Sequence, residues 1–150
     1  MTKILRIALV SLFFFSPCFA NAAPADDAAA VVDRWAAAFT ANDTAAVVSC
    51  YAPDATLLGT TSTVLTQGSD AIRAYFSRIP NSGNSVKIGD RHVVVLGSDA
   101  VLVFGFYEFT FHVNGQAVPT PSRFSMVVMR RNGAWLIVHH HSSVLPKPLQ

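Results

Sequence analysis

The dipeptide Asn132-Gly133 constrains the fold of this chain more than any other feature. It separates two apolar segments within residues 123–143, and Asn-Gly favours a tight type I′ hairpin turn because both central residues need a positive φ. A second Asn-Gly pair, at 114–115, separates two earlier apolar segments. Long strands joined by such turns predict an antiparallel meander. The predicted strands of this meander cover residues 86–96, 100–112, 121–131 and 134–144.

The first half of the sequence has helical periodicity instead. Apolar residues recur at a spacing typical of helices, and alanines between them favour helix. The predicted helices cover residues 26–41, 44–51 and 70–79. A short strand, 55–58, and a polar, threonine-rich loop, 59–68, precede the last helix. Helices followed by consecutive strands indicate one α+β domain, residues 23–150, whose helices pack on one face of a curved antiparallel sheet.

The first 22 residues have the pattern of a secretory signal peptide. Lys3 and Arg6 precede an apolar run, 7–15, which is shorter than a membrane-spanning helix requires. Residues 20–22, Ala-Asn-Ala, form a small-x-small cleavage site. We therefore predict a periplasmic or secreted protein that begins at or near Ala23 and has no membrane association after cleavage.

Cleavage would leave a neutral chain with one cysteine. Residues 1–22 contain two of the 11 Lys and Arg residues and none of the nine Asp and Glu residues, so the mature chain would carry nine of each sign. It would lack the basic surplus that binding to nucleic acid or anionic lipid requires. Cys50 would have no intramolecular disulfide partner. We interpret Cys50 as a small buried apolar residue, with an intermolecular bridge or a nucleophile as the alternatives.

Strand 100–112 is apolar on both faces. Phe104 and Phe106 alternate with Val103 and Tyr107, as in a strand that is covered on both sides. The predicted helices would cover one face, and a large apolar patch on the other face would need a partner. The sequence therefore predicts a homodimer or a higher oligomer, built on the outer face of the meander.

Four stretches carry a resemblance to a known family: residues 38–53, 68–76, 97–109 and 123–143. They resemble the nuclear transport factor 2-like superfamily, which includes ketosteroid isomerase and SnoaL-like polyketide cyclases. Within it, the chain is most similar to the association, or hub, domain of calcium/calmodulin-dependent protein kinase II and to small secreted bacterial proteins with the same His-His-His-Ser-Ser ending. The resemblance implies a cone-shaped fold and self-association. It implies no kinase activity, because the sequence contains no glycine-rich loop, catalytic-loop Asp or Mg²⁺-binding motif.

The resemblance also implies a ligand site inside the cone. The hub cavity is lined partly by arginines; Arg123 matches one of them, whereas Tyr107 and Ser142 stand at the positions of others. His140 alternates with Ser142 and Val138 along the last strand, away from His139 and His141. The predicted ligand-binding residues are Tyr107, Arg123, His140 and Ser142, beneath Trp35, Phe39 and Tyr51. Arginine, tyrosine and histidine together suit a small carboxylate or other polar ligand.

The predicted direction of Arg123 depends on which residues face inward. Ser125, Val127 and Met129 alternate with Arg123, and we interpret this set as the interior face. The guanidinium would then enter a partly apolar environment, where a charge must be paired. Asp54 or a bound anion could pair with it.

Two other functions remain open. An isomerase, cyclase or hydrolase would need a base inside the cone, and Asp54 and His140 are the candidates. A metal site could use the histidine triplet 139–141, with His92 or His112 as a further ligand. Only two of the three histidines in the triplet share a face of the strand, however. The sequence assigns no catalytic residue, metal or cofactor. It favours a non-enzymatic binding or assembly domain.

Overall fold

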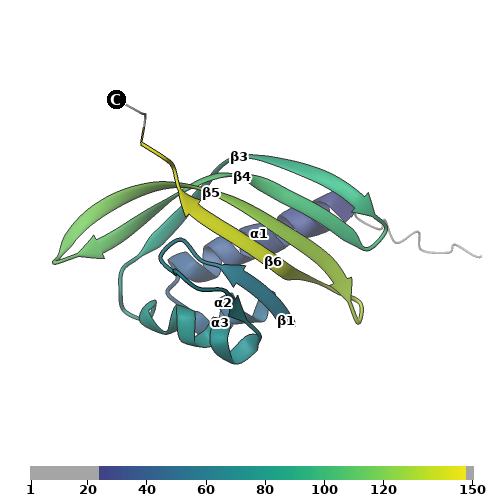
Figure 1. Ribbon diagram of the computed structural model, residues 1–150, viewed down its shortest axis with the longest axis horizontal. Helices are drawn as coiled ribbons and strands as arrows, with labels where there is room; N and C mark the ends of the chain where they lie inside the picture. The colour runs from purple at the N-terminus through teal and green to yellow at the C-terminus, as the bar shows by residue number, and fades with distance from the viewer. Residues whose placement is uncertain (1–23, 148–150) are drawn as a thin grey trace, which may run out of the picture.

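The computed structural model describes residues 24–147, in which helices lie within the curve of one sheet (Figure 1). The helices are α1 (Pro24–Thr40), α2 (Thr44–Ser49) and α3 (Ser69–Tyr75), with a 3-10 turn, η1 (Phe76–Arg78). The strands are β1 (Tyr51–Leu58), β2 (Thr66–Gln67), β3 (Ser85–Gly97), β4 (Ala100–Val113), β5 (Gln116–Arg131) and β6 (Ala134–Val144). The predicted α+β class is confirmed. The predicted signal peptide lies outside the described residues.

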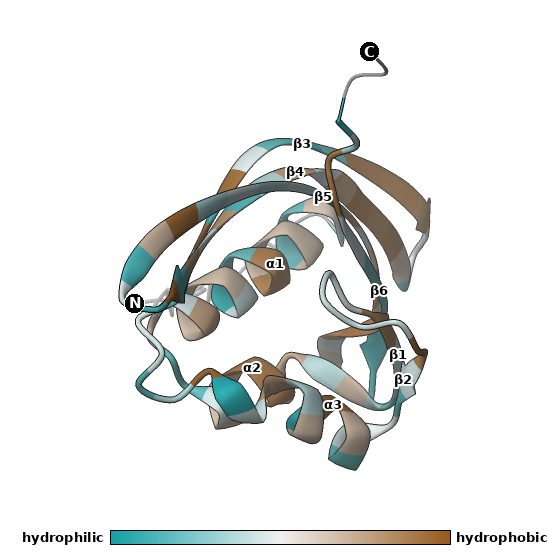
Figure 2. Ribbon diagram, turned by 60° about the vertical axis from the view of Figure 1, so that its left-hand side comes forward, coloured by the Kyte–Doolittle hydropathy of each residue, from teal (hydrophilic) through white to brown (hydrophobic). Residues whose placement is uncertain are grey.

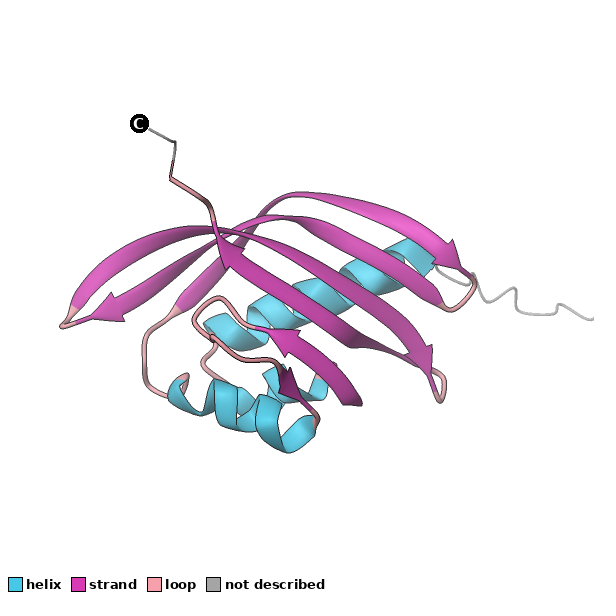
Figure 3. Cartoon of the chain, in the orientation of Figure 1, coloured by secondary structure: helices cyan, strands magenta, loops and turns pink. Residues whose placement is uncertain are grey.

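The sheet has the strand order β2-β1-β6-β5-β4-β3. Strands β3 to β6 form the predicted antiparallel meander (Figure 3). The pairing of the short first strand was not predicted: β1 pairs with β6 in parallel, so the sheet as a whole is mixed. Strand β1 also begins at Tyr51, where a helix was predicted, and β2 lies within the predicted loop.

Both hairpin turns have the geometry that their sequences predict. Asn114 and Asn132 have φ values of 51° and 50°, and the glycines that follow them have φ values of 76° and 84°. A positive φ at both central residues is the requirement of a type I′ turn. These turns fix the register of β4 against β5 and of β5 against β6.

Helix α1 lies on the concave side of the sheet, and α2 and α3 cover the end of the cone beside β1 (Figure 2). The buried face of α1 includes Val31, Trp35 and Phe39, which recur at helical spacing. On its exposed side, Asp33 pairs with Arg91 of β3 at 2.5 Å. Helix α1 is therefore attached to the concave face of the sheet through its buried apolar side and through this ion pair.

A β-bulge in β6 changes which residues face the core. The register with β5 shifts between Val127 and Val128, so that β6 contains one extra residue at Val138. Ile137 is buried before the bulge, and His140 is buried after it. The simple alternation that grouped His140 with Val138 therefore does not extend across the bulge.

Among the described residues, no helix has both the length and the apolar character needed to cross a membrane.

Candidate functional site

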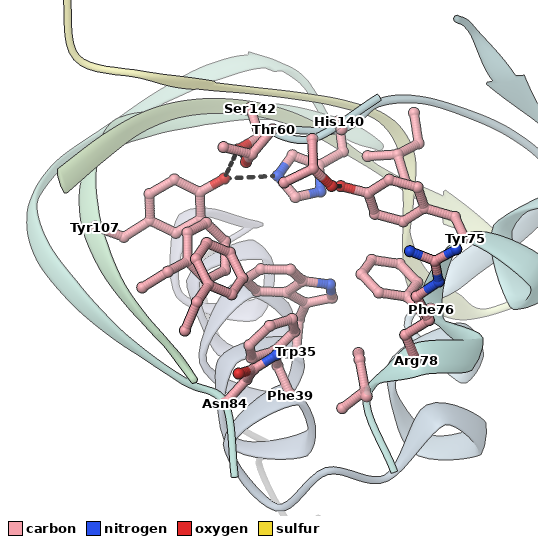
Figure 4. A pocket seen from close by; sticks show the side chains of 16 residues that line it. Trp35, Phe39, Thr60, Tyr75, Phe76, Arg78, Asn84, Tyr107, His140 and Ser142 are labelled. Carbon is pink, nitrogen blue, oxygen red and sulfur yellow. Dashed lines mark hydrogen bonds between the residues drawn. The ribbon is translucent and has the colours of Figure 1, made fainter. Parts of the chain in front are cut away.

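A cavity of about 290 Å³ lies between α1, η1 and the inner face of the sheet (Figure 4). Aromatic rings form much of its wall: Trp35, Phe39, Tyr75, Phe76, Phe109 and Phe111. Polar side chains gather at one end: Thr60, Tyr107, His140 and Ser142. An apolar wall with a few convergent polar groups is typical of a small-molecule site.

His140 lies at the centre of the polar end and is 1 % exposed. Its Nδ1 is 2.8 Å from the Tyr51 hydroxyl, and its Nε2 is 3.4 Å from the Tyr107 hydroxyl. Burial lowers the pKa of His140 to about 3, and the neighbouring His139 and His141 add to this effect. The imidazole is therefore neutral at neutral pH, with both nitrogens engaged.

The hydrogen-bonded chain continues from Tyr107 toward the β1–β2 loop. The Tyr107 hydroxyl donates to Ser142 Oγ, and Ser142 Oγ contacts Thr60 Oγ1. Burial raises the pKa of Tyr107, an effect that the nearby hydroxyls of Ser142 and Thr60 partly offset. Burial also raises the pKa of Tyr51 well above its usual value. Both phenols therefore stay protonated, and five polar side chains from β1, β4, β6 and the loop form one continuous chain.

Trp35 packs against the polar chain from α1. Its ring meets His140 edge to face, with centroids 5.1 Å apart, and lies 6.1 Å from the ring of Tyr107. Its indole N–H has no partner of hydrogen-bonding geometry, although it lies near enough to the Tyr51 hydroxyl to lower that group's pKa. Trp35 thus holds the imidazole in position by packing.

The opposite end of the cavity carries one charge. Arg78 of η1 is exposed and is the single charged side chain among the described residues that line the cavity. Asn84 also lies there, in the loop before β3. Neither residue was identified from the sequence, because η1 and this loop have no pattern that places them beside the cone.

Most of the predicted site residues lie together. Trp35, Tyr107, His140 and Ser142 line the cavity, and Tyr51 reaches it through His140. Thr60 was not predicted, because a position in a polar loop gives no indication that the loop folds against β6.

Arg123 does not enter the cone, and this part of the prediction is wrong. On β5 the buried residues are Ser122, Phe124, Met126 and Val128, so that the odd-numbered side chains face outward. Alternation along this strand holds as predicted, but α1 covers the even-numbered face. Arg123 Nε instead donates to Ser143 Oγ at 3.1 Å.

The outer face of the sheet has its own hollow, of about 380 Å³. Arg123 lines it together with His92, Phe104, Phe106 and His141. The ring of His92 stacks on that of Phe104, with centroids 5.4 Å apart. This hollow is separated from the cone by the thickness of the sheet.

The alternative catalytic and metal sites have little support from the geometry. Asp54 is exposed and does not line the cavity. His139 contacts Thr56 Oγ1 at 2.7 Å, and His141 lies on the outer face. Within residues 24–147, no group of three His, Cys, Asp or Glu side chains is placed to hold a metal ion. Cys50 is buried, as predicted, and burial raises the pKa of its thiol.

Comparison with known proteins agrees with this architecture. The family model of the SnoaL-like domain matches residues 28–147. A solved structure of a putative calcium/calmodulin dependent protein kinase II association domain from Xanthomonas campestris is 34% identical, covers 85% of this chain and 94% of its own, and has a TM-score of 0.75.

More distant structures share the fold alone. A ketosteroid isomerase-like protein from Erwinia carotovora atroseptica is 19% identical, covers 82% of this chain and 97% of its own, and has a TM-score of 0.69. An NTF2-like protein with a cystatin-like fold from Novosphingobium aromaticivorans is 16% identical, covers 80% of each chain and has a TM-score of 0.68. The predicted cone-shaped fold and superfamily are confirmed. The chain belongs to the SnoaL-like domain family of the NTF2-like superfamily.

Proposed function

We propose that this protein is a non-enzymatic domain that binds a small molecule with an apolar body and a polar group inside its cone. The observation that carries this proposal is the cavity itself, whose aromatic wall ends at a hydrogen-bonded chain built from separate elements. Aromatic side chains supply apolar contact, and a few fixed polar groups orient a ligand. His140 is buried and does not act as a surface group. Its neutral imidazole is suited to hydrogen bonding.

Binding is favoured over catalysis by the state of His140. A general base works best with a pKa near the working pH and a free lone pair directed at the substrate. His140 has a pKa lowered to about 3 by burial, and both of its nitrogens contact tyrosine hydroxyls. The isomerase, cyclase or hydrolase alternative rests on the likeness to a ketosteroid isomerase-like protein, at 19% identity.

Arg78 provides a test of whether the ligand is a carboxylate. In a thermal-shift panel of aromatic carboxylic acids, Arg78→Met is expected to weaken binding by up to about fivefold, because an exposed ion pair contributes about 1 kcal/mol or less. The matched control is Arg123→Met, which removes the same charge from the opposite face of the sheet. If Arg123→Met weakened binding and Arg78→Met did not, the pairing of Arg78 with a ligand carboxylate would be contradicted.

We also infer that the protein self-associates through the outer face of the sheet. Phe106 is 50 % exposed there, and Val94 of β3 is exposed on the same side. The Xanthomonas campestris structure is described as an association domain, which supports an assembly role. Export to the periplasm, with cleavage near Ala23, remains a prediction.

Phe106→Asp is expected to convert the oligomer to a monomer, because a charge would have to be buried in an apolar contact. Light scattering at micromolar concentration measures the mass of both proteins. Ala71→Asp is the control, since it adds the same charge to an exposed position of α3. A wild-type mass equal to that of one chain would contradict the inference.

A further inference from the structure

The polar chain at the end of the cavity contains more hydrogen-bond donors than it can use. Its members are Tyr51, His140, Tyr107, Ser142 and Thr60, joined by contacts between consecutive members. Each of the four hydroxyls carries one proton, and a neutral imidazole carries one N–H. Because His140 is buried among uncharged groups and stays neutral, the protons outnumber the contacts by one.

The direction of one bond locates the surplus proton. Tyr107 donates its proton to Ser142, so its oxygen can only accept in its contact with His140. The imidazole must then carry its proton on Nε2, and its Nδ1 accepts from the Tyr51 hydroxyl. Every proton in this half of the chain is used.

The other half consists of Ser142 and Thr60. Ser142 accepts from Tyr107; apart from that bond, the two hydroxyls have two protons, one contact with each other and no further side-chain hydrogen-bond partner in the described part of the protein. Whichever hydroxyl donates in that contact, the proton of the other has no acceptor in the chain. Both side chains line the cavity (Figure 4).

We propose that the ligand presents an acceptor oxygen, from a carbonyl or carboxylate group, to the Thr60–Ser142 pair. This inference rests on the proposed function and adds the chemistry that the site recognises. A ligand oxygen accepts the surplus proton, whereas a hydrocarbon group at the same place leaves a donor unpaired. Trp35 carries a second N–H without a partner on the same cavity, so the cavity as a whole favours acceptors.

Three probes with the same naphthalene body test the proposal. 2-Acetylnaphthalene and 2-naphthoate carry an acceptor oxygen, and 2-ethylnaphthalene replaces it with carbon. Dissociation constants come from NMR titrations followed at the Trp35 indole N–H. The ketone is expected to bind wild type roughly tenfold more tightly than the ethyl compound, the effect of one unsatisfied donor. The order of the ketone and the naphthoate then shows which of the two groups the site prefers.

A double variant locates the donor. Thr60→Val with Ser142→Ala is expected to reduce the preference for the ketone to about threefold or less, because the Tyr107 hydroxyl becomes the remaining donor and lies deeper. The matched control is Thr66→Val with Ser122→Ala, which likewise removes one threonine and one serine hydroxyl, here from buried positions outside the cavity. The control is expected to keep the wild-type preference.

The outcomes separate this inference from the proposed function. Equal affinity of wild type for the ketone and the ethyl compound would overturn the acceptor proposal while leaving binding in the cone intact. A preference that survives in the double variant would overturn the assignment to Thr60 and Ser142. No response of the Trp35 indole to any probe would overturn the proposed function, and this inference with it.

Discussion

Replacement of Trp35 by alanine is expected to lower the free energy of unfolding by about 3–5 kcal/mol, as measured by chemical denaturation. The side chain is 1 % exposed and packs against Phe39, Tyr107 and His140, with ring centroids between 5.1 and 6.1 Å away. The void would join the existing cavity, and the sheet on the other side of it cannot collapse inward. A large loss of packing therefore remains uncompensated.

Trp35→Phe is the control for this substitution. It keeps an aromatic ring against His140 and is expected to cost less than half as much, because most of the apolar volume stays. The phenylalanine also lacks the unpartnered N–H of the indole. A loss of under about 1 kcal/mol in Trp35→Ala would show that this wall of the cavity contributes little to the core.

Acidification from pH 6.5 to about 3 is expected to lower the free energy of unfolding by up to about 4–5 kcal/mol through His140 alone. Burial depresses the pKa of His140 in the folded state, whereas the unfolded chain has the ordinary value of 6.5. Above pH 6.5 both states are neutral and the group has no effect. As the pH falls, His140 binds a proton in the unfolded state but not in the folded state. The free energy of unfolding therefore decreases until the pH reaches the pKa of His140 in the folded state.

The contribution of His140 is isolated by comparing pH profiles of stability. His140→Gln can accept from Tyr51 and donate to Tyr107 without titrating, so its profile is expected to be flatter than that of wild type between pH 6.5 and 3. His141→Gln is the matched control, because His141 is exposed on the outer face. Parallel profiles for wild type and His140→Gln would mean that the folded protein accepts the proton.

Local patterns in the sequence predicted much of the fold. Asn114 and Asn132, each followed by glycine, identified both hairpin turns, and the turns set the lengths and order of the last three strands. The apolar spacing around Trp35 identified α1. These features depend on neighbours in the chain, whose preferences are encoded residue by residue.

The site was predicted in part. Tyr107 and His140 line the cavity. The family resemblance placed Tyr107 and Ser142 in the cone, and alternation along β6 placed His140 with Ser142. Arg123 was misplaced, since alternation groups side chains by face without indicating which face is inside. Thr60 and Arg78 were missed because their positions depend on a loop and a 3-10 turn that fold against distant strands.

The sequence by itself determined the α+β class, the meander and the pairing of side chains on each face, because turn preferences and side-chain periodicity act over a few residues. The tertiary structure alone decided which face of β5 is buried, the parallel pairing of β1 with β6 and the shift in alternation at Val138. The shift at Val138 lies within the β5–β6 pair, whereas the other two depend on where α1 and β1 dock against strands far away in the chain. The contact between Thr60 and Ser142 has the same origin: it joins residues 82 positions apart.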